Sequence, residues 1–117
     1  MARENAILDK SKAFALRIIK LYKYLCGKNE YVLSKQLLRC GTSIGANVKE
    51  AIRGQSKADF YAKLNISLKE ASEAEYWLEL LFESDYMDKP AFDGIHADCQ
   101  EIIKLLVSIT KTQKNNS

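Results

Sequence analysis

The chain has 117 residues, of which 47% are hydrophobic and 28% charged, with one Pro and five Gly. This size is typical of one domain, and the scarcity of turn residues favours helices over strands. No apolar run approaches the ~20 residues of a membrane-spanning helix, and the N-terminal segment lacks the apolar stretch of a signal peptide. The composition therefore predicts a helical cytoplasmic protein with no membrane partner.

The three cysteines form no recognisable bridging or zinc-binding pattern. Cys26, Cys40 and Cys99 are odd in number and far apart, and no Cys-x-x-Cys motif occurs. A disulfide framework and a structural zinc site are therefore not expected. We expect the protein to work in a reducing compartment. Cys40 and Cys99 fall on or beside apolar helix faces, so we expect them to pack in the core.

The net charge of +3 conceals an uneven distribution along the chain. Residues 1–55 contain eleven Lys and Arg against four Asp and Glu, a net charge of +7, whereas residues 56–117 have a net charge of −4. The two halves are expected to attract each other, within one subunit or between subunits, unless the basic half faces a polyanion.

The first predicted helix spans residues 4–26. Its apolar residues recur with helical period along one narrow face, which comprises Ile7, Phe14, Ile18, Leu21 and Leu25. Basic residues occupy the opposite side, and Gly27 is a natural residue to end the helix.

The second predicted helix spans residues 33–53 and has a basic stripe opposite its apolar face. Gly41 and Gly45 inside it each cost about 1 kcal/mol of helix stability relative to Ala. Their spacing of four places them together on the helix surface, which predicts the close approach of a neighbouring helix. The alternative is a kink or break within residues 40–43.

The third predicted helix spans residues 57–84, with Ser56 as its N-cap. The face expected to join the core comprises Phe60, Leu64, Ala71, Ala74, Leu78 and Phe82. A second apolar stripe contains Ile66, Trp77 and Leu80, which we predict to form an oligomer interface. Alternatively, this helix is simply the most buried of the four.

The fourth predicted helix spans residues 89–111, with Asp88 as its cap and Pro90 in its first turn. Its apolar residues alternate three and four apart. Because the loops between these long helices are short, neighbouring helices must be antiparallel. The sequence therefore predicts an all-α fold, a single antiparallel up-down-up-down four-helix bundle over residues 1–117.

The residues offer no catalytic or metal-binding constellation. His96 is the single histidine, and no glutamate stands three residues before it, as the Glu-x-x-His pairs of a di-iron bundle would need. No arginine lies near His96 to form a helical ribonuclease pair, and no glycine-rich phosphate loop occurs. We therefore predict that the protein is not an enzyme and that it has no metal and no cofactor.

Basic stripes on the first two helices are the main functional signal. As sequence neighbours, these helices are expected to combine their stripes into one patch that binds phosphate backbones without base specificity. The predicted nucleic-acid-binding residues are Arg17, Lys20, Lys35, Arg39, Lys49 and Arg53. The alternative is that the lysine-rich surface only keeps the bundle in solution.

A structural role competes for Arg39. Arg39 lies on one edge of the second helix, where acids of the third helix can face it. Buried polar groups there would satisfy one another and set the helix register. The predicted polar network comprises Ser43, Asn47, Asp59, Lys63, Glu70 and Glu73.

Three segments together resemble a known family. They are KSKAFALRIIKLYK, LSKQLLRCGTSIGANVKEA and SKADFYAKLNISLKEASEAEYWLELL, which begin at Lys10, Leu33 and Ser56. The chain is similar, over about residues 9–109, to the 23S rRNA intervening-sequence proteins. The resemblance implies a four-helix bundle that forms homopentamers. A related group, the accessory proteins of diversity-generating retroelements, are more basic pentamers that bind RNA and a reverse transcriptase.

Two hypotheses follow from the residues and the resemblance. The first is a non-enzymatic RNA-associated accessory protein, a homopentamer that presents its basic face to phosphates. The second is an oligomeric scaffold that binds a protein partner and has no role with nucleic acid.

Overall fold

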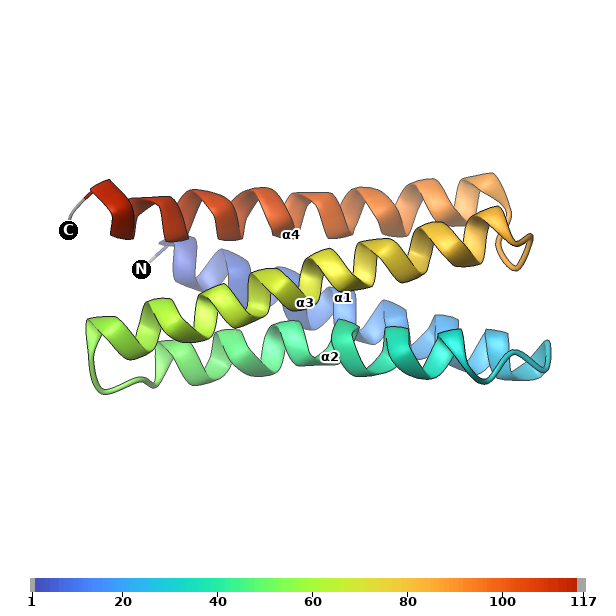
Figure 1. The fold of residues 1–117 in the computed structure, drawn as a ribbon, viewed down its shortest axis with the longest axis horizontal. Coiled ribbons are helices and arrows are strands. Elements are labelled where there is room, and N and C mark those ends of the chain that lie inside the picture. The colour runs from blue at the N-terminus through green and yellow to red at the C-terminus, as the bar shows by residue number, and fades with distance from the viewer. Residues whose placement is uncertain (1, 116–117) are drawn as a thin grey trace.

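Four α-helices account for nearly all of the chain (Figure 1). The computed structural model describes residues 2–115, and the side chains of residues 2–112. The helices are α1 (Ala2–Gly27), α2 (Leu33–Ile52), α3 (Lys57–Glu83) and α4 (Lys89–Asn115). They run alternately up and down along a rod of 46 × 21 × 20 Å. The predicted all-α four-helix bundle is therefore confirmed, with α1 and α4 slightly longer than expected.

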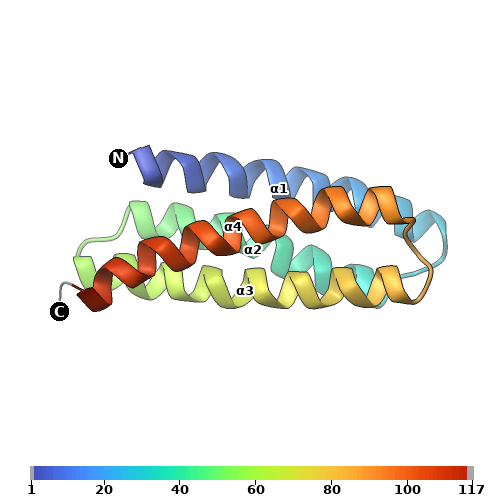
Figure 2. The same cartoon turned by 90° about the horizontal axis from the view of Figure 1, so that it is seen from above.

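Each helix packs against two others (Figures 1 and 2). Sequence neighbours lie side by side, and α4 returns to lie against α1. Among the described residues, the diagonal pairs α1–α3 and α2–α4 make no close contact. All four helices supply fully buried side chains, for example Phe14, Ile44, Leu78 and Leu106. None of the described helices is both long and apolar enough to span a bilayer.

The buried face of α3 differs from the expected one. It consists of Tyr61, Leu64, Ser67, Ala71, Ala74, Leu78 and Leu81. Phe60 and Phe82, which were expected in the core, are only partly buried. Ser67, a polar residue inside the seam, donates a 2.9 Å hydrogen bond from its hydroxyl to the Ile44 carbonyl of α2. A serine satisfied in this way can be buried, but it interrupts the apolar pattern in the sequence.

Gly41 and Gly45 allow α1 and α2 to approach closely. A Cβ atom added to Gly41 would lie 2.9 Å from Cγ1 of Ile18, and one on Gly45 would lie 3.3 Å from Oγ of Ser11 and 3.6 Å from its backbone carbon. Ser11 is fully buried at this contact. Helix α2 continues without a break from Leu33 to Ile52, so the close approach is confirmed and the alternative of a break is wrong.

Replacing Gly41 with alanine tests this contact. The added methyl group meets the stem of the Ile18 side chain, so the overpacking cost of about 1–3 kcal/mol should exceed the gain of about 1 kcal/mol in helix propensity. Gly41→Ala should therefore lower the midpoint of urea unfolding. Gly27→Ala is the matched control, because no heavy atom lies within 4 Å of its added Cβ. Equal or higher stability of Gly41→Ala than of Gly27→Ala would contradict the contact.

The helix ends follow local hydrogen bonding. Ser56 caps α3 by accepting a 3.1 Å hydrogen bond from the Asp59 amide, and Asp88 accepts a 2.9 Å bond from the Ala91 amide in α4, as predicted. Gly27 differs from the expectation, because it remains helical and has no positive φ. Asn29, with φ of 62°, takes the left-handed position instead.

Glu30 caps α2, a role that the sequence analysis missed. Its carboxylate accepts hydrogen bonds from the amides of Val32 (3.2 Å), Leu33 (2.8 Å) and Ser34 (2.7 Å), and the side chain is buried. Burial alone would raise the pKa of this carboxyl group, but the amide hydrogen bonds outweigh it, and the pKa lies below its ordinary value of 4.5. Glu30 stands two residues before the N-cap residue, Val32, so the usual N-cap preferences gave no signal.

The lowered pKa of Glu30 predicts a pH-dependent contribution to stability. Because the folded state favours the carboxylate, the contribution is complete above pH 4.5 and is lost as pH falls through the lower, folded-state pKa. Glu30→Gln should lower the free energy of unfolding by about 1 kcal/mol at neutral pH, and its deficit should shrink in acid. Urea titrations at both pH values, with exposed Glu83→Gln as control, measure this. A deficit that does not change with pH would contradict it.

Candidate nucleic-acid interface

Helices α1 and α2 share one outward surface, and their register decides which basic residues meet on it. The glycine contacts set the first half of α1 beside the second half of α2. Lys12 and Lys49 therefore line opposite sides of one groove. By the same antiparallel register, Lys20 and Lys23 lie beside the segment of α2 that begins near Lys35.

Six cations on this surface lack a carboxylate within ion-pair distance in the part of the chain that the structure describes. All six are exposed, and they are Lys12, Lys20, Lys23, Lys35, Lys49 and Arg53. We call this set the basic face. It contains four of the six residues that were predicted to bind nucleic acid. Lys12 and Lys23 are additions, and they become evident only once the register between the two helices is known.

Arg17 points away from the basic face toward α4. Its guanidinium pairs with the Asp98 carboxylate and donates a long 3.5 Å hydrogen bond to the Gly94 carbonyl. One neighbouring pair of α1 and α4, Lys10 with Glu101, is made in the same way. These exposed pairs join the two helices, so Arg17 serves the α1–α4 contact.

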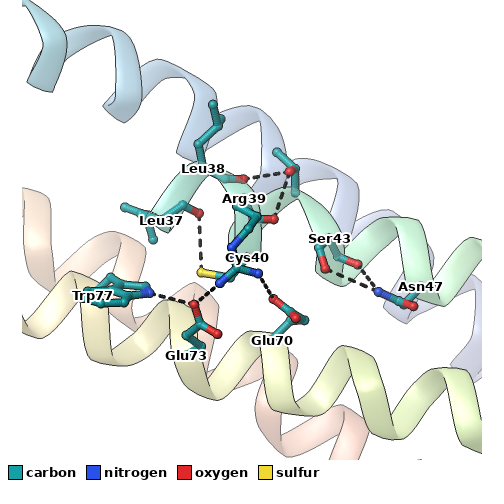
Figure 3. A network of polar contacts seen from close by, with 10 residues as sticks. Leu37, Leu38, Arg39, Cys40, Ser43, Asn47, Glu70, Glu73 and Trp77 are labelled. Carbon is teal, nitrogen blue, oxygen red and sulfur yellow. Dashed lines mark hydrogen bonds and ion pairs between the residues drawn. The ribbon is translucent and has the colours of Figure 1, made fainter. Parts of the chain in front are cut away.

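Arg39 is engaged by two acids of α3 (Figure 3). Its guanidinium pairs with Glu73 and lies 3.2 Å from the Glu70 carboxylate. Glu73 also accepts a 3.0 Å hydrogen bond from the Trp77 indole N–H. Arg39, Glu70, Glu73 and Trp77 therefore form one network across the α2–α3 contact. Its arginine is half exposed, so the energetic value of each pair is at most about 1 kcal/mol.

The other predicted network residues lie outside this cluster. Asn47 donates to the Ser43 carbonyl at 2.9 Å within α2, as Figure 3 shows. Lys63 pairs with Glu50 at 3.6 Å, again between α2 and α3. Asp59 contributes its backbone amide to the cap of α3. The structure thus distributes these polar residues over three separate local contacts.

The predicted oligomer interface contains one well-exposed residue. Ile66 is 42% exposed, whereas Trp77 and Leu80 are partly buried and Trp77 packs against the core. Tyr76, which was not predicted, is 54% exposed beside Trp77, with the two ring centroids 5.3 Å apart. Ile66 and Tyr76 are therefore the well-exposed large apolar residues among those described on α3.

The two buried cysteines are poorly suited to act as nucleophiles. Burial raises the pKa of both Cys40 and Cys99 to about 12, so these thiols stay protonated at neutral pH. His96 stacks on the Phe92 ring, and its Nε2 lies 3.2 Å from the Glu75 carboxylate. Within the described residues, no three His, Cys, Asp or Glu side chains gather as metal ligands would.

Comparisons with known proteins agree with this architecture. No curated protein matches the chain. A crystal structure from Bacteroides thetaiotaomicron VPI-5482, of a protein of unknown function from the S23 ribosomal protein family, is 55% identical with a TM-score of 0.91. The match covers 93% of this chain and 98% of that one. Residues 3–108 match the 23S rRNA-intervening sequence protein family, and the chain therefore belongs to that family.

Proposed function

We propose that this protein is a non-enzymatic, oligomeric RNA-associated accessory protein that holds phosphate backbones on its basic face. The observation that supports this proposal most is that some cations of α1 and α2 are paired with acids, whereas those of the basic face are not. Arg39 and Arg17 are paired with acids of α3 and α4, whereas the six cations of the basic face have no such partner among the residues that the structure describes. An unpaired surface lysine that neutralises a phosphate releases counterions condensed on the nucleic acid, and no ion pair has to be broken first.

The structure alters which residues carry the proposal. Lys20, Lys35, Lys49 and Arg53 remain in it, and Lys12 and Lys23 join them. Arg17 and Arg39 would each have to give up interhelical contacts to bind a phosphate, so we assign them to the bundle itself. The reference to rRNA in the name of the family is compatible with an RNA partner.

Assembly into a homopentamer, which the family resemblance implies, completes the proposal. Exposed Ile66 and Tyr76 supply apolar surface for contact with a second copy, together with the partly buried Trp77 and Leu80. A ring of copies would repeat the basic face and increase its avidity for one long RNA.

Charge reversal on the basic face tests RNA binding. Replacing Lys35, Lys49 and Arg53 with glutamate should abolish binding of a fluorescent single-stranded RNA at moderate salt. At low salt, the slope of log binding constant against log salt should become shallower by about 2 units. Fluorescence anisotropy titrations measure both quantities.

A matched reversal elsewhere controls for net charge. Lys69, Lys104 and Lys111 are exposed on α3 and α4, and changing them to glutamate alters the total charge equally. This control and Arg39→Gln should retain most of the affinity. If the unchanged protein ignores RNA at low salt, or if all variants bind alike, the proposal fails and a protein-binding scaffold becomes the better account.

Ile66→Glu tests the assembly. The change places a charge in the apolar surface of α3 without touching the core, so it should convert an oligomer into a 13.3 kDa monomer while circular dichroism stays helical. Light scattering gives the mass, and Val107→Glu, at a 45% exposed position of α4, is the control. A monomeric starting protein, or an oligomer that survives Ile66→Glu, would contradict the assignment.

A further inference from the structure

We propose that the groove between α1 and α2 is the site where a nucleic-acid strand makes its closest contact, with its phosphates between Lys12 and Lys49. This inference rests on the proposed function and specifies where on the basic face the strand lies.

The groove is shaped by the close approach of the two helices. It encloses about 380 Å³, and small residues line it, namely Ser11, Ala15, Thr42, Gly45 and Ala46. Because these side chains are short, a ligand can come near both helix backbones. Lys12 and Lys49 stand on opposite helices at the rim, and neither has a carboxylate within ion-pair distance. Asp9 is the acid among the lining residues, so the two lysines leave a net positive charge.

A second hollow extends this path toward the α2–α3 turn. It shares Ala46 and Lys49 with the groove and continues to Arg53, which has no acid within ion-pair distance among the described residues. Glu50 and Asp59 also line this hollow, and Glu50 pairs with Lys63. The two adjoining hollows therefore present Lys12, Lys49 and Arg53 in succession. A row of separated cations suits a polymer with one charge per repeat better than it suits a single small anion.

The hollow between α1 and α4 is less suitable for a nucleic-acid strand. The cavity between α1 and α4 encloses about 160 Å³, and the lysine that lines it, Lys10, already pairs with Glu101. No aromatic residue lines the α1–α2 groove, so bases find no stacking surface there. The contact should therefore involve the phosphate backbone and show no sequence preference.

A groove-filling variant separates shape from charge. Ala46→Leu keeps every cation and places a favourable helix residue at an exposed position, so the bundle should fold normally. By blocking the approach to Lys12 and Lys49 it should weaken binding of a labelled single-stranded RNA, on the order of tenfold, because the strand loses its phosphate contacts with both lysines. Ala97→Leu, an equivalent change at an exposed position of α4, should leave the affinity unchanged.

Lys12→Gln provides a second, independent readout, with Lys104→Gln on α4 as its control. It should reduce the salt slope by about 0.7 units, one phosphate contact of a single strand. If the triple charge reversal on the basic face weakens RNA binding but Ala46→Leu and Lys12→Gln do not, the assignment of the strand to the groove is wrong while the proposed function stands. If the unchanged protein does not bind RNA, both fail. Displacement of RNA by polyglutamate at equal charge would also overturn the groove as a nucleic-acid site.

Discussion

The close approach of α1 and α2 at Gly41 and Gly45 is the constraint on which the rest of this bundle depends. With no side chain at these positions, Ile18 and the backbone near Ser11 come into direct contact with α2. The contact sets the antiparallel register of the two helices, and the register places Lys12 opposite Lys49. Packing thus explains the presence of two glycines that would weaken an isolated helix. The groove that we assign to nucleic acid is a consequence of the same contact, since small residues line it.

Electrostatics then divides the cations into two classes. Two of the three arginines that the sequence suggested as phosphate contacts lie at helix–helix seams, where Asp98 binds Arg17 and a pair of glutamates binds Arg39. A planar guanidinium is well suited to such shared positions between helices. The lysines of the basic face are instead exposed to solvent. The acidic second half of the chain therefore neutralises selected residues of the basic half, and the basic face retains its charge.

Much of the fold could be predicted because helical periodicity, caps such as Ser56 and short loops each depend on nearby residues. The failures have specific causes. Ser67 interrupts the apolar pattern of the buried face of α3, so that face was not fully identified from the sequence. Glu30 caps α2 although a glutamate rarely has this role. The candidate site was harder to predict from the sequence. A helical stripe shows which residues share one face of a helix, but not which acid of the neighbouring helix faces them. That information lies in the register between helices, which single-helix periodicity does not contain.

Lysine footprinting tests the central claim most directly, because it needs no substitution. The protein would be acetylated briefly with and without single-stranded RNA at low salt, and the modified lysines quantified by mass spectrometry. The account predicts that RNA protects Lys12, Lys35 and Lys49, while Lys69 and Lys104 react as before. Uniform protection, protection confined to α3 and α4, or no protection at all would contradict it.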